Sequence, residues 1–442
     1  MGTATLQGWT SSPNDRGTID ILTGSVLTLV LCTWSVLCLN VYPTSYSWWR
    51  RTFRKLLMAG FTWLAPEFVF QLAIGQWCLA RQSVKKFSES GYEGWTIRHA
   101  FFANQGGFVL HPQLSPTEEW PPFPVDANQI HYLITNNYIP YSAVYIEMEV
   151  IKDKNKVDRL LRFLTVCQIL WYLIGLLARA SQGLAITVLE LSTIGFIFCS
   201  LGTYYYWFNK PMDVGKPFAL EVNATLREIL IDAGDLVQRP CLETPLDFAG
   251  RDDWSFSLCW KYCWRIMSKL GIQPAPRKWP IDKIPDDYFA PQPFIPMCIL
   301  FIVHTGYAAV HIAGWNFVFP SQVETIIWRV TTISVMASLL IFWFVHLWWW
   351  IWVPALMNRV RRMHQRNGQV QADLPAKTAK KFKNPYNPRS QIPVAALLPV
   401  LVCSTVYIIS RAYIILESFI DLRALPPSAY QTVDWSAFIP HF

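Results

Sequence analysis

A single acidic residue, Glu67, stands near the middle of an apolar segment that is long enough to cross a bilayer. The segment covers residues 56–80 and contains Pro66 directly before the glutamate. A carboxylate at that depth costs several kcal/mol unless it is paired, protonated or in contact with water, so an acid within a membrane segment is typical of a functional site. We therefore expect a membrane protein with a polar interior, in which Glu67 donates a proton or anchors a ligand by hydrogen bonding.

Two histidines could take part in the same acid–base chemistry. His304 and His311 share one face of a predicted helix at a spacing of seven residues. They lie about 10 Å apart along the helix axis, at 1.5 Å rise per residue, which is too far to bind one metal ion together. We expect Glu67, His304 and His311 to be catalytic. The alternative is that each histidine only bonds the backbone of a neighbouring helix.

Further side chains at membrane depth could contact a bound molecule. Gln71 shares the helix face of Glu67 at a spacing of four residues, and Arg411 is the obvious partner for the Glu67 carboxylate. The predicted substrate-binding residues are Gln71, Trp63, Gln168 and Arg411. Hydrogen bonds to neighbouring helices are the alternative role for the glutamines.

Seven apolar segments must position these residues. Hydrophobic residues make up 52% of the 442-residue chain and charged residues 15%, against about 25% charged in an average soluble domain. Each segment reaches or approaches the roughly 20 residues that a membrane helix needs. The segments cover residues 19–39, 56–80, 160–178, 184–207, 294–313, 326–353 and 394–420. The predicted fold is an all-α, polytopic membrane helix bundle that forms a single domain over residues 1–442.

Basic residues predict which ends of the helices face the cytosol. The long connections 81–159, 209–293 and 354–391 hold nearly all of the positive charge, so we expect them in the cytosol, with the N terminus on their side and the C terminus opposite. One connection disagrees, because Arg50, Arg51, Arg54 and Lys55 would then lie outside. We follow the majority, and we attribute the net charge of +8 to membrane orientation rather than to nucleic-acid binding.

Two acids next to apolar segments have a structural explanation. Glu190 follows Thr187, and Glu324 follows Ser321, in the S/T-x-x-E spacing of a capping box. In that motif the glutamate bonds back to the start of its own helix, so we expect both residues to begin helices. Amphipathic helices are also predicted within the long connections, over residues 225–237 and 254–270.

The sequence contains no motif for a cofactor, a metal ion or a nucleotide. The acidic doublets at Asp252 and Asp286 do not continue into the D-D-x-x-D arrangement that binds magnesium and diphosphate. Clustered histidine boxes, a P-loop, G-x-G-x-x-G and G-x-S-x-G are absent, and the ten cysteines include no C-x-x-C pair. We expect no cofactor and no metal, and chemistry carried out by side chains of the bundle itself.

Several strings along nearly the whole chain resemble a widespread group of multi-pass fungal membrane proteins. They are RGTIDIL, CTWSVLCLNV, APEF, GQW, AFFANQGGFVL, ARASQGLAITVLELSTIGF, YYYWFNKPMDV, GWNFVFPSQVETIIWR and LPPSAYQTVDWSAFIPH. Some proteins of this group sit beside natural-product biosynthetic genes. The resemblance therefore implies a cyclase or pericyclase that acts on a lipophilic, terpenoid-like intermediate of fungal secondary metabolism.

Two functions of different classes remain open at this point. The first is a cofactor-independent enzyme, in which aromatic walls fold an apolar substrate and polar groups promote cyclisation. The second is an ion or proton channel or transporter, in which Glu67, the glutamines and the histidines line a polar path. We favour the enzyme, located in the endoplasmic reticulum membrane, with the bilayer and a lipophilic small molecule as its partners; the oligomeric state stays open.

Overall fold

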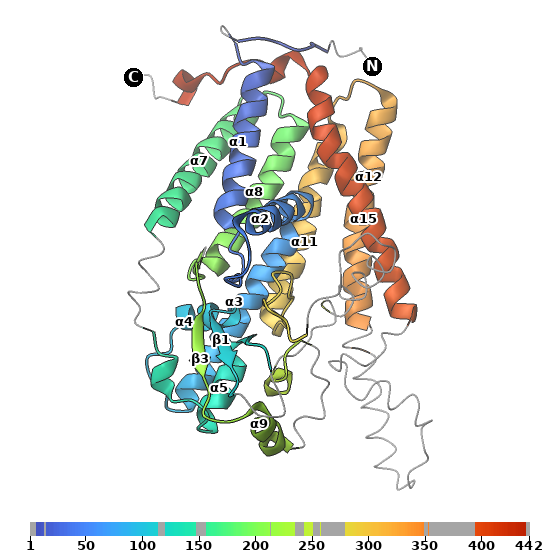
Figure 1. Cartoon of the computed structure of the whole chain (residues 1–442). Helices are drawn as coiled ribbons and strands as arrows, with labels where there is room; N and C mark the ends of the chain where they lie inside the picture. Colours follow the sequence, from blue (N-terminus) through green and yellow to red (C-terminus); the bar gives the residue numbers. More distant parts are fainter. Residues whose placement is uncertain are drawn as a thin grey trace, which may run out of the picture.

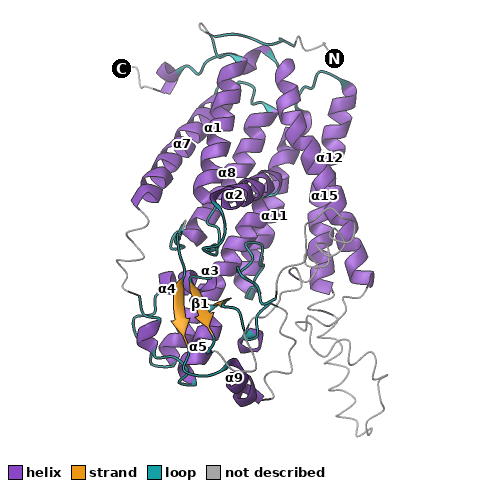
Figure 2. Ribbon diagram, viewed as in Figure 1, coloured by secondary structure: helices purple, strands orange, loops and turns teal. Residues whose placement is uncertain are grey.

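The chain folds into a bundle of long helices above a layer of short helices and strands (Figure 1; Figure 2). The structure is a computed structural model that describes residues 6–12, 15–113, 120–146, 156–212, 214–234, 243–250, 257, 279–348, 352 and 394–438. The predicted class, an all-α bundle of membrane helices, is confirmed, with one small sheet added in the lower layer. The long apolar helices are consistent with a multi-pass integral membrane protein.

Six helices are long and apolar enough to cross a membrane on their own. Each corresponds to one of the predicted segments, with ends that differ by a few residues. Their bounds are α1 Thr18–Val36, α7 Lys156–Ser181, α8 Val188–Trp207, α11 Phe294–Ala313, α12 Gln322–Leu347 and α15 Val394–Ile420.

Capping boxes start α8 and α12, as the sequence predicts. The hydroxyl of Thr187 accepts from the N–H of Glu190 at 3.3 Å, and the Glu190 carboxylate accepts from the N–H of Thr187 at 2.9 Å. Ser321 and Glu324 repeat the arrangement at the start of α12. Each glutamate also binds an arginine from a terminal segment: Arg16 for Glu190, and Arg423 for Glu324. These acids therefore have structural roles.

The apolar segment over residues 56–80 is not one straight helix. Two helices, α2 Trp48–Leu64 and α3 Pro66–Glu89, replace it and meet at a bend of 111°. The apolar composition continues across the bend, so hydropathy alone does not reveal it. Half of α2 is also unsuited to a membrane core, because basic side chains alternate with exposed Trp48, Trp49 and Phe53, which is typical of an interfacial helix.

The segment between α1 and α2 contacts the end of α4 (Ile97–Asn104). The N–H of Val41 donates to the carbonyl of Gln105, which follows α4, at 2.9 Å. The chain termini meet at the opposite end of the bundle, where Gln7 forms a bridge with Leu425 (Figure 1). The bent α2–α3 pair is a broken span or a re-entrant loop, beside the six described helices that could cross a membrane on their own.

This geometry corrects the predicted topology. The N terminus lies beside the C terminus and opposite the long connections, not on their side. Arg54, in the basic first half of α2, lies within electrostatic range of Lys283 in the long connection 209–293. Which end of the bundle faces the cytosol stays a prediction.

The lower layer combines short helices with a three-stranded sheet (Figure 2). Strand β1 pairs with β2 antiparallel and with β3 parallel, in the order β2-β1-β3. The elements are α4 Ile97–Asn104, β1 Phe108–His111, β2 Phe123–Val125, α5 Ala127–Thr135, β3 Phe218–Glu221 and α9 Leu226–Ala233. Single turns of 3₁₀ helix cover Tyr141–Ala143, Asp247–Ala249, Gly314–Asn316, Asp421–Arg423, Pro427–Ala429 and Trp435–Phe438. Helix α9 lies within the predicted 225–237, of which residues 235–237 lie outside the described residues.

Two predicted features lie outside the described residues. The amphipathic helix over residues 254–270 does so apart from Ser257, and the basic part of the connection 354–391 does so entirely.

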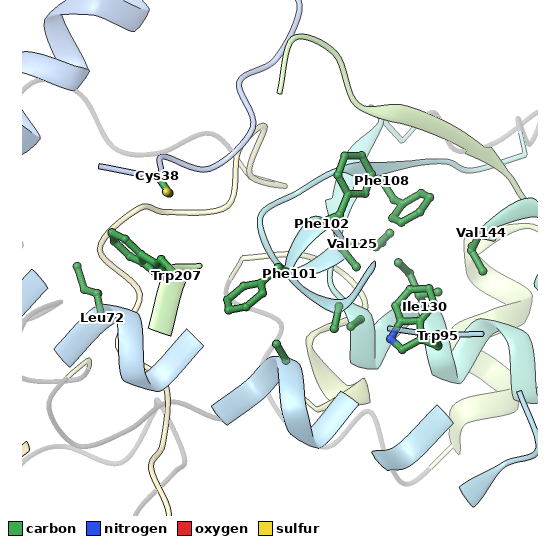
Figure 3. Packing of buried hydrophobic residues seen from close by; sticks show 14 of the residues in the cluster. Cys38, Leu72, Trp95, Phe101, Phe102, Phe108, Val125, Ile130, Val144 and Trp207 are labelled. Carbon is green, nitrogen blue, oxygen red and sulfur yellow. The ribbon is translucent and has the colours of Figure 1, made fainter. Parts of the chain in front are cut away.

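The largest hydrophobic cluster joins the bundle to the lower layer. It runs from Leu72 in α3 and Trp207 at the end of α8 to Phe101 in α4 and Phe108 in β1 (Figure 3). Because the cluster is continuous, the lower layer is packed against the bundle and in particular against α3.

Gly202 allows α3 and α8 to approach closely. A Cβ atom at this position would lie 2.4 Å from the ring of Phe70. We expect Gly202→Ala to lower stability by about 1–3 kcal/mol, the usual cost of overpacking a core. Gly175→Ala in α7 is the matched control, because a Cβ atom there meets nothing within 4 Å. Melting temperatures in detergent test this, and equal shifts for the two variants would contradict the close approach.

Candidate functional site

The break between α2 and α3 places Glu67 at the centre of the bundle. Ala65 has φ −147° and ψ 69°, outside the helical region, and Pro66 has no N–H to continue the hydrogen bonds of α2. Glu67 therefore stands in the first turn of α3, with its side chain completely buried. Tyr407 and Cys199, from the middle turns of α15 and α8, both interact with it. The carboxylate thus lies near mid-depth.

The direct partner of Glu67 is a tyrosine rather than the predicted arginine. The hydroxyl of Tyr407 donates to Oε1 of Glu67. Oε2 is buried and has no hydrogen-bond partner among the described residues. Arg411 lies within electrostatic range of the carboxylate, although these two described side chains do not form an ion pair. Glu67 and Arg411, the predicted pair, therefore interact only through electrostatics and not through a direct ion pair.

Arg411 instead joins three helices around the site. Its Nε donates to the carbonyl of Leu64, the last residue of α2, at 3.0 Å. Its NH1 group lies 3.0 Å from Nε2 of His311, and the guanidinium sits 4.9 Å from the ring centre of Tyr307. Because an arginine only donates, Nε2 of His311 accepts, and Nδ1 then carries the proton donated to the Tyr307 carbonyl at 3.0 Å. His311 is thus a neutral acceptor with both nitrogens occupied.

His304 faces the site from the other side. Nε1 of Trp343 in α12 donates to Nδ1 of His304 at 3.2 Å, so the histidine carries its proton on Nε2. That atom lies close to the backbone of Glu67 but makes no well-formed hydrogen bond within the described chain. The ring also contacts Phe68, with centroids 5.4 Å apart. His304 therefore offers a free N–H donor next to Glu67.

The predicted substrate-binding residues divide into two groups. Gln71 is completely buried one turn after Glu67, and neither atom of its amide has a partner among the described residues. Trp63 and Gln168 lie elsewhere, since the Trp63 indole donates to Thr33 of α1 at 2.8 Å and the Gln168 amide donates to Thr28 at 3.3 Å. Those two residues attach α2 and α7 to α1, and the structure does not bring them to the Glu67 centre.

Four aromatic residues of the site, Phe68, Tyr307, Trp343 and Tyr407, were missed in the sequence. Tyr407 and Tyr307 each stand four residues before a polar residue that was recognised, Arg411 and His311 respectively. That spacing puts each pair on one helix face, and it was the available signal. Trp343 carried no such signal, because its role depends on how α12 packs against α11. With these residues the site, hereafter the Glu67 centre, comprises Glu67, Phe68, Gln71, His304, Tyr307, His311, Trp343, Tyr407 and Arg411.

The Glu67 centre can exchange protons and form new hydrogen bonds. Among the described residues, a carboxylate oxygen of Glu67 and the amide of Gln71, one turn apart on α3, and the imidazole N–H of His304 on α11 are unpaired. Rings of Phe68, Tyr407 and Trp343 surround them. Among the described residues, no three His, Cys, Asp or Glu side chains gather in a way that could hold a metal ion. The chemistry available is acid–base catalysis inside an aromatic enclosure.

Comparison with known proteins places the chain in one family. A family model matches residues 2–231 and 297–442, most of the chain. The chain belongs to DUF8562, a family of unknown function. Every residue of the Glu67 centre lies within the DUF8562 match, whereas residues 232–296 lie outside it. No curated protein and no solved structure matches the chain.

Proposed function

We propose that this chain is an integral-membrane, cofactor-independent enzyme, and that the Glu67 centre binds and converts a lipophilic small molecule. The observation that carries the proposal is the set of unpaired polar groups on Glu67, Gln71 and His304. Each buried polar group without a partner costs about 1–3 kcal/mol. A bound substrate would recover this free energy if one of its oxygens accepted a hydrogen bond from His304 and another of its groups formed a hydrogen bond with Glu67. The aromatic rings would enclose the apolar remainder.

The chemistry we propose is a cyclisation by proton transfer. The protonated Glu67 carboxyl donates to a double bond or oxygen of the substrate, and the ring closes while aromatic faces stabilise the developing positive charge. Loss of a proton back to Glu67 completes an isomerisation, so the reaction consumes no co-reactant. The resemblance to fungal membrane proteins near natural-product genes supports a terpenoid-like substrate and a cyclase or pericyclase activity.

The decisive experiment looks for the bound molecule. Protein purified from a fungal host in mild detergent is examined by native mass spectrometry and by solvent extraction. The enzyme proposal expects a lipophilic compound of defined mass, present at no more than one molecule per chain. Recovery of nothing beyond detergent and membrane lipids, from several hosts and with candidate terpenoids added, would contradict it.

A transport function is the second candidate, and the break between α2 and α3 favours it. Discontinuous helices at mid-depth, with the N-terminal end of one half-helix beside polar groups, are typical of transporter binding sites. Proteoliposomes with a pH-sensitive dye inside distinguish the two functions. A proton flux that depends on Glu67, in protein free of bound lipophile, would replace the enzyme proposal with a transporter.

We also propose that the long connections face the cytosol and that the protein resides in the endoplasmic reticulum membrane. Basic residues at one end of the bundle support this orientation. The exposed sequon at Asn223 lies at that end and should carry no glycan. A sequon appended after Phe442 is the control and should be glycosylated. Digestion with an endoglycosidase reads both results, and a glycan on Asn223 alone would invert the orientation.

A further inference from the structure

A second polar site lies where the bundle meets the lower layer. It is a cavity of about 40 Å³, which is room for roughly three water molecules. Part of its polar lining comes from α3, the end of α4 and the segments that follow α1 and α8: Gln76, Asn104, Gln105, Asn40 and Lys210; Asp126, Asn128 and Glu243 line the other part. Figure 3 shows Cys38, Trp207 and Phe101 at the same junction. The cavity is separate from the Glu67 centre and shares none of its residues.

Lys210 brings a buried positive charge to this cavity. Its ammonium group is 3% exposed and donates to the carbonyl of Cys38 at 2.7 Å, to Oδ1 of Asn40 at 3.2 Å and to Oε1 of Gln76 at 2.9 Å. All three acceptors are neutral, and no described carboxylate forms an ion pair with it. Asp286, the acid that influences it, is paired with Lys283 at 2.5 Å. Burial accordingly lowers the pKa of Lys210 to about 8.

The side-chain amides of Gln76 and Asn104 are fixed in place, and their amino groups make no hydrogen bond within the described chain. Oε1 of Gln76 accepts from Lys210 and also from the Trp207 indole at 3.1 Å, which fixes the amide and leaves its amino group as the remaining donor. Oδ1 of Asn104 accepts from the N–H of Ala127 at 3.1 Å, with the same result. The cavity is therefore rich in donors that have fixed directions.

Gln105 gives an independent sign that the cavity takes a ligand. Its side chain is 1% exposed, and neither its amide nitrogen nor its amide oxygen has a hydrogen-bond partner within the described chain. Such a group is costly unless something else completes its hydrogen bonds. It lines the same cavity as the ammonium of Lys210 and the amino groups of Gln76 and Asn104.

We propose that this cavity binds the carboxylate of a small molecule, through the N–H groups of Gln76, Asn104 and Gln105 in the field of Lys210. A carboxylate supplies the oxygen acceptors that these N–H donors need, and its single negative charge matches the ammonium group of Lys210, which has no described acidic partner at ion-pair distance. Asp126 and Glu243 also line the cavity and limit the ligand to one charge. The Asp126 carboxylate accepts from the N–H groups of Asn128 and Gln129 at the start of α5, which disperses its charge.

The test uses acetate as the probe on the purified, full-length protein. Its melting temperature in detergent is followed as sodium acetate replaces sodium chloride at constant ionic strength, and acetamide is titrated in parallel. We expect a saturable rise with acetate and none with acetamide. No saturable rise, or an equal rise with the neutral amide, would overturn the carboxylate site.

Two buried glutamines provide the matched variants. Gln105→Leu removes a group that has no protein partner, so it should fold at least as stably as wild type while weakening acetate binding at least tenfold. Gln71→Leu removes an equally buried, equally unpaired amide outside the cavity and should retain the acetate response. A wild-type response in Gln105→Leu, or a matching loss in Gln71→Leu, would refute the site. Neither result depends on whether the Glu67 centre is catalytic.

Discussion

Glu67→Gln is expected to reduce turnover of the bound lipophile at least about 100-fold, the usual range for removing a general acid, while leaving the fold intact. The amide keeps an oxygen for the hydroxyl of Tyr407, and its amino group takes the place of Oε2, which has no partner. What disappears is the exchangeable proton. Product formation, measured with the compound recovered from wild-type protein, is compared with the melting temperature of the same sample.

Glu190→Gln is the matched control for this experiment. Glu190 is as completely buried as Glu67, but it serves the capping box of α8 and binds Arg16. Its replacement should lower the melting temperature and leave turnover per folded molecule unchanged. Wild-type turnover in Glu67→Gln would end the assignment of Glu67 as the acid, whatever its stability.

Arg411→Met is expected to cause the largest loss of stability, about 3 kcal/mol or more, the range seen when one member of a buried charged network is removed. The guanidinium holds the last carbonyl of α2, at Leu64, and the acceptor nitrogen of His311. Both would be left without this donor. The bend between α2 and α3 should loosen first. Limited proteolysis near residues 43–47, alongside thermal melting, follows both effects.

A double-mutant cycle separates the two roles of Arg411. Because Tyr407, not Arg411, binds Glu67 directly, we expect a coupling energy of about 1 kcal/mol between Glu67→Gln and Arg411→Met, at the low end for residues of one network. Most of the Arg411 cost should persist in the double variant. Full rescue of stability by Glu67→Gln would instead mean that the two charges form a structural pair.

The sequence specified the crossing helices well, because twenty apolar residues in a row and a capping box are local signals. It specified the bend poorly. Pro66 indicated a break, but the bend of 111° depends on how α2 and α3 pack against the other helices. The two termini lie together, where Gln7 bridges to Leu425, and not at opposite ends as predicted; which end faces the cytosol stays a prediction.

Some residues of the two sites could be predicted from the sequence and others could not, and the difference has a physical cause. A carboxylate in an apolar segment is conspicuous, so Glu67 and its helix neighbour Gln71 were found. Its partner Tyr407 is 340 residues away and belongs to a residue type that is common in membrane helices. Lys210 was overlooked because a lysine just beyond a membrane helix is usually solvated. Only packing of the chain near Cys38 and Asn40 against it makes that charge a buried one.

The contacts between the two ends of the chain determine the order in which the parts of the bundle can fold during synthesis. Arg179, at the end of α7, donates to the carbonyls of Ser428, Ala429 and Gln431, and Gln7 pairs with Leu425. During synthesis the first helix and α7 are made hundreds of residues before these partners leave the ribosome. The C-terminal segment therefore closes the bundle last, and a truncation that removes it leaves the buried guanidinium of Arg179 with the carbonyl of Ala185 as its remaining described acceptor.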